Sequence, residues 1–196
     1  MIIGLTGPTG SGKSTFSCML EEKGFYIINC DSVAREVVEK GSPLLDVLAE
    51  AFSEEILNSD GTLNRKKLAE LAFCDKESTE LLNSIMLPYI ADRIGETVDG
   101  LVIDGINNIL LDAPTLFESG IDSICDCVVA VLCDRKIRRQ RIIERDNLTD
   151  EQADVRLNAS KPDDFYLERT KFVIYNDGTK EQFVASAEKV FGEIFK

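Results

Sequence analysis

The chain has 196 residues, of which 44% are hydrophobic and 29% charged, a composition typical of a folded globular protein and unlike that of a disordered or fibrous one. Its formal net charge of −13 disfavours a protein that coats DNA or RNA, because such proteins carry excess positive charge toward the phosphates. Histidine is absent, which excludes Ser-His-Asp triads, Cys-His pairs and zinc sites with a histidine ligand, so a general base must be a carboxylate, a lysine or a less common group.

The first predicted element is a short apolar strand over residues 2–5, and a glycine-rich segment follows it directly. Residues 7–14 read Gly-Pro-Thr-Gly-Ser-Gly-Lys-Ser and fit G-x-x-x-x-G-K-[ST], the phosphate-binding P-loop. Glycines let successive backbone N–H groups converge on phosphate oxygens, and the helix expected near Gly12 adds its positive N-terminal end. Lys13 would place its charge between a transferred phosphoryl group and its leaving group, while Ser14 would offer a hydroxyl to magnesium. A glycine-rich turn with an incidental lysine is the alternative.

A P-loop alone does not distinguish GTPases, motors, transporter ATPases and kinases. The chain contains no N-K-x-D tetrapeptide for guanine recognition and no LSGGQ-like stretch. The rest of the chain is also short for a motor. A small nucleotide or metabolite kinase is the class that fits this length.

The next helix is predicted over residues 13–23, with Gly24 ending it, and a strand follows over residues 25–28. This strand delivers Asp31 to the carboxyl end of the sheet, where open α/β sheets bind their ligands. A carboxylate there could face the P-loop phosphates and take the proton from an attacking substrate hydroxyl. Asp31 could equally be the N-cap of a helix starting at Ser32, and its position alone does not separate the two roles.

Residues 32–98 have helical periodicity interrupted by a loop at 58–61, a stretch too long for a simple crossover and typical of an inserted helical lobe. Continued helical spacing extends the last helix past Gly100, and Asn107 and Asn108 end it. The strand that follows, residues 109–111, leads into Asp112. This residue could hold magnesium as a Walker B aspartate does, or it could be an ordinary turn residue.

A strand over residues 126–133 is followed by a helix predicted from Asp134, its N-cap, to Arg145. Residues 135–145 carry six basic side chains and one acidic one, a local charge of +5. Arg138, Arg141 and Arg145 recur at helical spacing on one face, and converging guanidiniums can stabilise a transferring phosphoryl group. A solvated helix face and a contact to nucleic acid are the alternatives.

Two capping boxes mark the last helices. Thr149 and Gln152 open one helix, residues 172–175 form the last strand, and Thr179 and Gln182 open the closing helix. The apolar face of that closing helix carries Phe183, Ala187, Val190, Phe191 and Ile194. The alternation of helices and strands along the chain predicts an α/β fold with a parallel sheet.

These segments together resemble the dephospho-CoA kinase family nearly from end to end. The most specific segment is residues 111–118, which read L-D-A-P-T-L-F-E and resemble the family's D-x-P-L-L-F-E. The other matching segments are residues 3–7 with 10–15, residues 31–35 (D-x-x-A-R), residues 60–63 and 83–88 in the helical lobe, residues 141–146 in the lid, and residues 176–178, the late N-x-G associated with the adenine pocket.

The resemblance implies a P-loop NTPase-type α/β fold, with a five-stranded parallel sheet flanked by helices, an inserted helical substrate lobe and a short lid. It implies a single kinase domain with its core in residues 1–31, 107–134 and 171–196, a CoA-binding lobe in residues 32–106 and a lid in residues 135–170. The implied activity is ATP-dependent phosphorylation of the ribose 3′-hydroxyl of dephospho-CoA, the last step of coenzyme A biosynthesis, with ATP as co-substrate and Mg²⁺ as the metal.

The resemblance also implies roles for particular residues. The catalytic residues would be Asp31, as the base acting on the acceptor hydroxyl, with Lys13 and Arg141. Magnesium would be held by Ser14 and Asp112. Nucleotide binding would fall to Gly10, Ser11, Gly12, Lys13, Ser14, Thr15, Arg145 and Asn176. Acceptor binding would fall to Thr6, Arg35, Pro114 and Glu118.

The chain departs from the family pattern at positions that concern the acceptor. Leu87 stands where the family usually has histidine before a proline, and Asn29, Ser160 and Tyr175 replace an aspartate, a lid glutamine and another aspartate. A P-loop kinase of another small acceptor, such as a nucleoside monophosphate, is therefore a rival hypothesis. An ATP-binding regulator without transfer activity is a second rival, although it would be expected to lose Asp31 or Lys13, and both are present.

The longest uninterrupted apolar run is seven residues, 127–133, too short to span a bilayer, and the first five residues lack the basic flank and length of a signal peptide. The six cysteines form no CxxC pair and are expected to be reduced thiols. We therefore expect a cytoplasmic protein, a monomer or small homo-oligomer, with dephospho-CoA and ATP as its partners and neither nucleic acid nor membrane among them.

Overall fold

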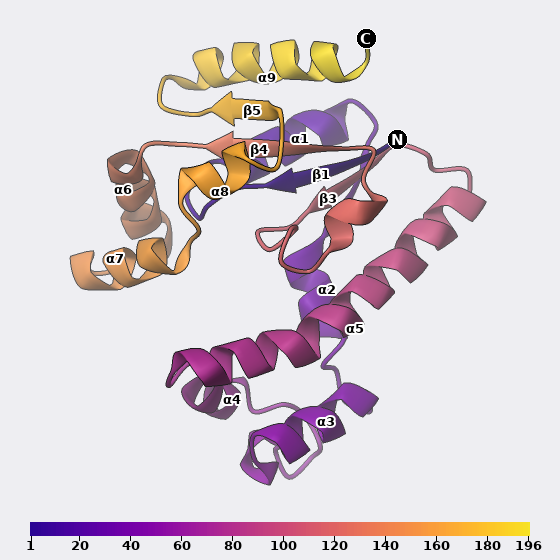
Figure 1. Cartoon of the computed structure of the whole chain (residues 1–196), viewed down its shortest axis with the longest axis vertical. Coiled ribbons are helices and arrows are strands. Elements are labelled where there is room, and N and C mark those ends of the chain that lie inside the picture. Colours follow the sequence, from indigo (N-terminus) through magenta and orange to yellow (C-terminus); the bar gives the residue numbers. More distant parts are fainter. The chain divides into compact units, whose positions relative to one another are not determined.

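The computed structural model describes residues 1–196 and contains a five-stranded parallel sheet with the strand order β2-β3-β1-β4-β5. The strands are β1 (Ile2–Thr6), β2 (Tyr26–Asn29), β3 (Ile109–Asp112), β4 (Cys127–Leu132) and β5 (Phe172–Tyr175). The central strand β1 pairs in parallel with β3 and β4, so that Leu5 lies opposite Asp112 and Thr6 opposite Ala130. Figure 1 shows β3, β1, β4 and β5 side by side. The fold predicted from the sequence is confirmed.

The chain divides into two compact units. The sheet unit comprises Met1–Ile28, Gly105–Phe117 and Ile121–Lys196, and the helical unit comprises Asn29–Asp104 and Glu118–Gly120. No helix in either unit is both long enough and apolar enough to cross a membrane.

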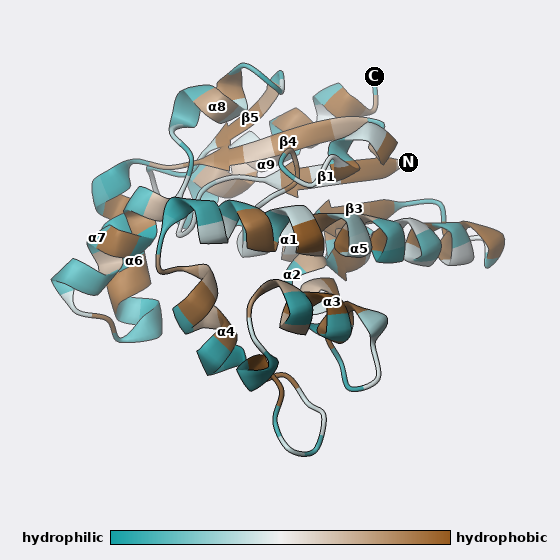
Figure 2. Cartoon of the chain, turned by 60° about the horizontal axis from the view of Figure 1, so that its bottom comes forward, coloured by the Kyte–Doolittle hydropathy of each residue, from teal (hydrophilic) through white to brown (hydrophobic).

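Alternating side chains give the sheet two different packed faces. On one face, α1 (Lys13–Glu22) and α9 (Lys180–Ile194) share a core with the strands, to which Phe16 and Phe183 contribute. On the other face, α8 (Asp163–Leu167) places Tyr166 against Ala130 and Leu132 of β4. Figure 2 shows β1 and β4 coloured as hydrophobic along most of their length, as expected for strands covered on both sides.

Two further helices follow β4 at the end of the sheet toward which the strands point (Figure 1). They are α6 (Arg135–Asp146) and α7 (Asp150–Ala159), and a short 3₁₀ helix, η2 (Ile121–Ile124), precedes β4. Asp134 caps α6 as predicted, by accepting a hydrogen bond from the Lys136 N–H, and both predicted capping boxes, at Thr149 and Thr179, are present. Asn147, at the end of α6, has a φ of 52° and turns the chain toward α7.

The helical unit contains α2 (Cys30–Glu36), α3 (Pro43–Ala51), η1 (Glu54–Ile56), α4 (Arg65–Ala72) and the long α5 (Lys76–Ile103). Its own core includes Leu44, Leu48 and Ile56, none of which is exposed to solvent. The extension of the helix past Gly100 is confirmed, because α5 ends at Ile103. Gly105, at φ 84°, follows that end.

The expected start of α2 is wrong by two residues. The helix begins at Cys30, and its N-cap is Asn29, whose Oδ1 accepts a hydrogen bond from the Ser32 N–H at 3.0 Å. Asparagine and aspartate cap about equally well, so the local capping preference did not favour Asp31 over Asn29. Asp31 lies in the first turn of the helix and is therefore not its cap.

Candidate nucleotide site

The P-loop connects β1 to α1 and depends on glycine at three positions. Gly7, Gly10 and Gly12 have φ values of 138°, 77° and 104°, which side-chain-bearing residues rarely adopt. Space is also limiting, because a Cβ on Gly7 would lie 2.2 Å from the Val131 carbonyl oxygen, and one on Gly12 would lie 2.1 Å from Asn176 Nδ2. The loop is therefore both bent and closely packed.

Lys13 is the first residue of α1, and its side chain folds back over the loop. Its Nζ donates to the Gly7 carbonyl at 2.8 Å and to the Pro8 carbonyl at 3.5 Å. The N-terminus of α1 has no side-chain cap and no acidic residue in its first turn, so its positive end faces no negative side chain of its own helix. Ser14, which is exposed, and Thr15 lie in that first turn. This arrangement suits a phosphate group.

Asp112 ends β3 beside the central strand. Its Oδ2 accepts a hydrogen bond from Ser17 Oγ at 2.9 Å, which ties the carboxylate to the same helix that carries Ser14. Ser17 was not singled out in the sequence, although its place one turn after Ser14 was a usable signal. No group of three or more histidine, cysteine, aspartate or glutamate side chains could hold a metal ion by itself.

Arg141 and Asn176 connect α6 and the loop after β5 to the P-loop. Arg141 Nη1 donates to the Gly10 and Ser11 carbonyls, at 3.5 Å each, and its Nη2 donates to the Asn176 carbonyl at 3.1 Å. Asn176 Nδ2 in turn donates to the Ser11 carbonyl at 2.7 Å. Buried Cys133 lies beside them, and its Sγ donates to the Asn176 carbonyl. Burial raises the pKa of this thiol to about 11, so it stays protonated at neutral pH.

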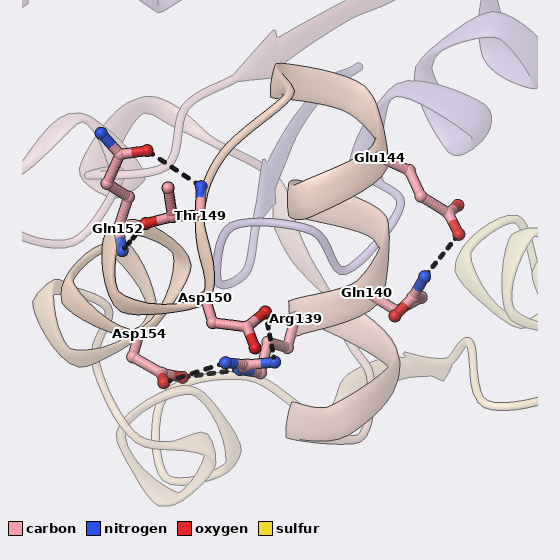
Figure 3. Close-up of polar contacts among 7 residues, drawn as sticks. All are labelled: Arg139, Gln140, Glu144, Thr149, Asp150, Gln152 and Asp154. Carbon is pink, nitrogen blue, oxygen red and sulfur yellow. Dashed lines mark hydrogen bonds and ion pairs between the residues drawn. The ribbon is translucent and has the colours of Figure 1, made fainter.

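Two other arginines of α6, Arg139 and Arg145, pair with acidic side chains of the lid segment instead. Figure 3 shows Arg139 between two carboxylates, Asp150 at 3.2 Å and Asp154 at 2.9 Å. Arg145 pairs with Asp146 at 2.8 Å, and Arg156 of α7 pairs with the same carboxylate. Arg145 therefore makes no hydrogen bond to the P-loop, and the basic face of α6 is divided between two sets of partners.

The predicted acceptor residues are divided between the two units. Thr6 is fully buried in the sheet unit, and its Oγ1 donates to the Pro114 carbonyl at 3.3 Å. Asp31, Arg35 and Glu118 belong to the helical unit and are exposed. The Arg35 carbonyl accepts a hydrogen bond from Arg65 Nη2 at 3.5 Å.

The helical unit also contains an apolar pocket of about 130 Å³. Arg65 is its only charged lining residue. The other lining residues are Ala34, Val38, Leu63, Leu68, Ala69, Phe73, Leu82 and Met86. Such a pocket suits an uncharged, flexible part of a ligand.

Residues 1–182 match the family model described as dephospho-CoA kinase. The chain is 42% identical over 192 residues to the dephospho-CoA kinase of Corynebacterium glutamicum, covering 98% of this chain and 96% of the relative. It is 35% identical to that of Anaeromyxobacter dehalogenans, with coverage of 98% and 92%.

Among solved structures, the chain resembles dephospho-CoA kinase from Campylobacter jejuni, with a TM-score of 0.71, 27% identity and coverage of 98% and 96%. It also resembles a Thermus thermophilus protein, with a TM-score of 0.80, 28% identity and coverage of 98% and 97%.

Proposed function

The chain belongs to the dephospho-CoA kinase family, and on this basis we propose that it transfers the γ-phosphoryl group of ATP to the ribose 3′-hydroxyl of dephospho-CoA, giving coenzyme A and ADP. The observation that carries the proposal is the P-loop, whose three glycines have positive φ. Lys13 folds over this loop, and Arg141 and Asn176 bond to its carbonyls. Phosphoryl transfer depends mainly on such positioning and on charge stabilisation.

In this mechanism, the P-loop N–H groups and Lys13 bind the β- and γ-phosphates, with Gly10, Ser11, Gly12, Ser14 and Thr15 forming the loop and first helical turn around them. Arg141 forms no ion pair within the protein, so its charge remains available to stabilise the transferring phosphoryl group. Asn176, which bonds to Ser11, is proposed to contribute to nucleotide binding, as is Arg145, although it pairs with Asp146.

The residues present also fit Mg²⁺. This ion typically binds through one or two protein oxygens and completes its shell with phosphates and water. Ser14 and Asp112 supply a hydroxyl and a carboxylate of that kind, and Ser17 orients the carboxylate. When bound, the ion would neutralise charge on the phosphates of ATP.

Asp31 is proposed as the base that takes the proton from the acceptor hydroxyl. It follows β2 by two residues, it is exposed, and Asn29 performs the capping role that would otherwise explain it. With no histidine in the chain, a carboxylate is a natural alternative base.

The helical unit is proposed to bind the acceptor, through Arg35, Glu118 and the apolar pocket beside Arg65. Thr6 and Pro114, in the sheet unit, are proposed as further acceptor-binding residues. All six cysteines are free, which suits the reducing cytoplasm. We propose that the protein acts there as a monomer or small homo-oligomer, without nucleic acid or membrane as a partner.

Acceptor specificity can be tested by incubating the purified protein with ATP, Mg²⁺ and a panel that contains dephospho-CoA and the nucleoside monophosphates. We expect coenzyme A and ADP to form in equal amounts and the monophosphates to remain unchanged. Phosphorylation of a monophosphate alone would support the rival kinase, and ATP binding without transfer to any acceptor would support a regulator.

Asp31→Asn should lower kcat by about 10²- to 10⁴-fold, because the amide cannot accept the proton. The melting temperature and the affinity for ATP should stay near those of the wild type, since Asn29 caps the helix. Asp46→Asn is a matched control, because Asp46 also lies in the first turn of a helix of this unit. Turnover of Asp31→Asn within a few-fold of wild type would remove Asp31 from the mechanism.

A further inference from the structure

Two buried side-chain atoms in the chain have no hydrogen-bond partner, Ser11 Oγ and Arg138 Nη1. Ser11 is fully buried in the P-loop. Arg138 belongs to α6, and its Cβ would lie 3.2 Å from a Cβ placed on Gly10. Ser11 Oγ therefore belongs to the P-loop, and Arg138 belongs to the helix whose backbone packs against Gly10 of the same loop. Buried polar atoms nearly always have a hydrogen-bond partner in native proteins. Because both atoms without a partner belong to residues at the P-loop, we expect a bound ligand to supply the missing partner.

Arg138 is the more informative of the two, because it is charged. Its residue is 6% exposed, and its Nε donates to the Cys133 carbonyl at 2.9 Å. It forms no ion pair, whereas Arg139 and Arg145, on the same helix and more exposed, pair with Asp150, Asp154 and Asp146. An arginine remains protonated in proteins, and a buried charge without a counter-charge is costly.

We infer that Arg138 is a further nucleotide-binding residue, whose Nη1 donates to the phosphates of bound ATP. The inference rests on the proposed function for the identity of the nucleotide, but not on the acceptor or on the transfer step. The nucleotide is anionic, and it is the ligand that the adjoining P-loop is shaped to receive. The helix α6 then contributes two charges to the site, Arg138 and Arg141, three residues apart and both without a carboxylate partner.

The test is the affinity for ATP, measured by titration calorimetry without any acceptor, together with the melting temperature of the ligand-free protein. Arg138→Met keeps the length of the apolar stem and removes the charge. We expect ATP to bind about 10- to 100-fold more weakly, as for the loss of a hydrogen bond to a charged group. The melting temperature should be unchanged or higher, because an uncompensated buried charge has been removed.

Arg139→Met is the matched control, since it removes a charge from the next position of α6, which pairs only with the lid acids. Its affinity for ATP should remain within about twofold of wild type. The inference is overturned if Arg138→Met binds ATP as the wild type does, if both variants lose affinity equally, or if Arg138→Met only lowers the melting temperature.

Should Arg138→Met not fold, Arg138→Lys tests the same point, because lysine keeps the charge but lacks the forked donors. A loss of ATP affinity of about threefold or more in the folded lysine variant supports the inference, and wild-type affinity overturns it. Because no acceptor is present, failure to phosphorylate dephospho-CoA would reject the proposed function without affecting this result.

Discussion

Neighbours from three distant segments hold the P-loop residues in place. Val131 of β4 lies against Gly7, Asn176 lies against Gly12, and Arg141 bonds to the carbonyls of Gly10 and Ser11. The loop therefore does not stand alone as a flexible glycine-rich turn. Lys13, Arg141 and Asn176 donate hydrogen bonds to its carbonyl oxygens and so hold its backbone in the bent form that a phosphate-binding loop needs.

At the scale of single residues, Arg141→Ala tests whether Arg141 stabilises the transition state of phosphoryl transfer. We expect kcat to fall on the order of 10³-fold, as when an arginine finger is removed, with a smaller change in KM for ATP. Steady-state kinetics on the folded variant separates the two parameters. Arg135→Ala is the control, because Arg135 lies on the same helix but bonds to Asn158. A raised KM with unchanged kcat would assign Arg141 to uniform binding of ATP instead.

At the scale of elements, several ion pairs join α6 to α7. Arg139 bridges to two acids of α7, and Arg145 and Arg156 share Asp146 (Figure 3 shows the Arg139 contacts). Only Ala153 and Leu157 of α7 are fully buried. The stability of the contact between α6 and α7 should therefore depend on pH and on salt concentration more than the stability of the sheet does.

Asp146 gives that pH response a definite direction. Hydrogen bonding from Arg145 lowers its pKa from 3.8 to about 2, so the folded state favours the ionised form. The stabilisation of the folded state by the ionised Asp146 carboxylate is fully present above about pH 4, and it is lost as the pH falls from about 4 toward 2. Titration of the Asp146 carboxyl by NMR should show a midpoint near 2, and Arg145→Gln should move it toward 3.8. An unshifted midpoint in the wild type would contradict the ion pair.

At the scale of the whole molecule, each unit has its own hydrophobic core. One core of the sheet unit joins α1 and α9 to the strands, whereas a separate core of the helical unit is built from side chains of residues 37–86. Damage to the helical core should therefore affect stability separately from nucleotide binding.

Leu48→Ala tests this separation, since Leu48 is fully buried in the helical core. We expect the free energy of unfolding of this unit to fall by about 2–5 kcal/mol, measured by urea titration, and the affinity for ATP to remain unchanged. Val47→Ala is the control, because Val47 is 38% exposed on the same helix. A tenfold loss of ATP affinity in folded Leu48→Ala would contradict the separation.

The features that could be predicted from the sequence are those that neighbouring residues determine. The P-loop needs glycines and a lysine at fixed spacing, and the capping boxes at Thr149 and Thr179 need two residues three positions apart. Helix and strand periodicity likewise predicted the strands and the end of α5 to within a few residues. These preferences act over one or two turns of chain, so the linear order of residues is enough to identify them.

Only the tertiary structure decided which members of such patterns face the site. Arg138, Arg141 and Arg145 recur at helical spacing, but Arg145 pairs with Asp146, Arg138 donates to the Cys133 carbonyl, and Arg141 alone donates to the P-loop carbonyls. Ser17 is hydrogen-bonded to Asp112, which lies 95 residues away in the sequence, and Asn176 is hydrogen-bonded to Ser11, which lies 165 residues away. Contacts over such separations depend on how the strands and helices pack, and side chains with the same local preference are distinguished only by the partners that packing brings to them.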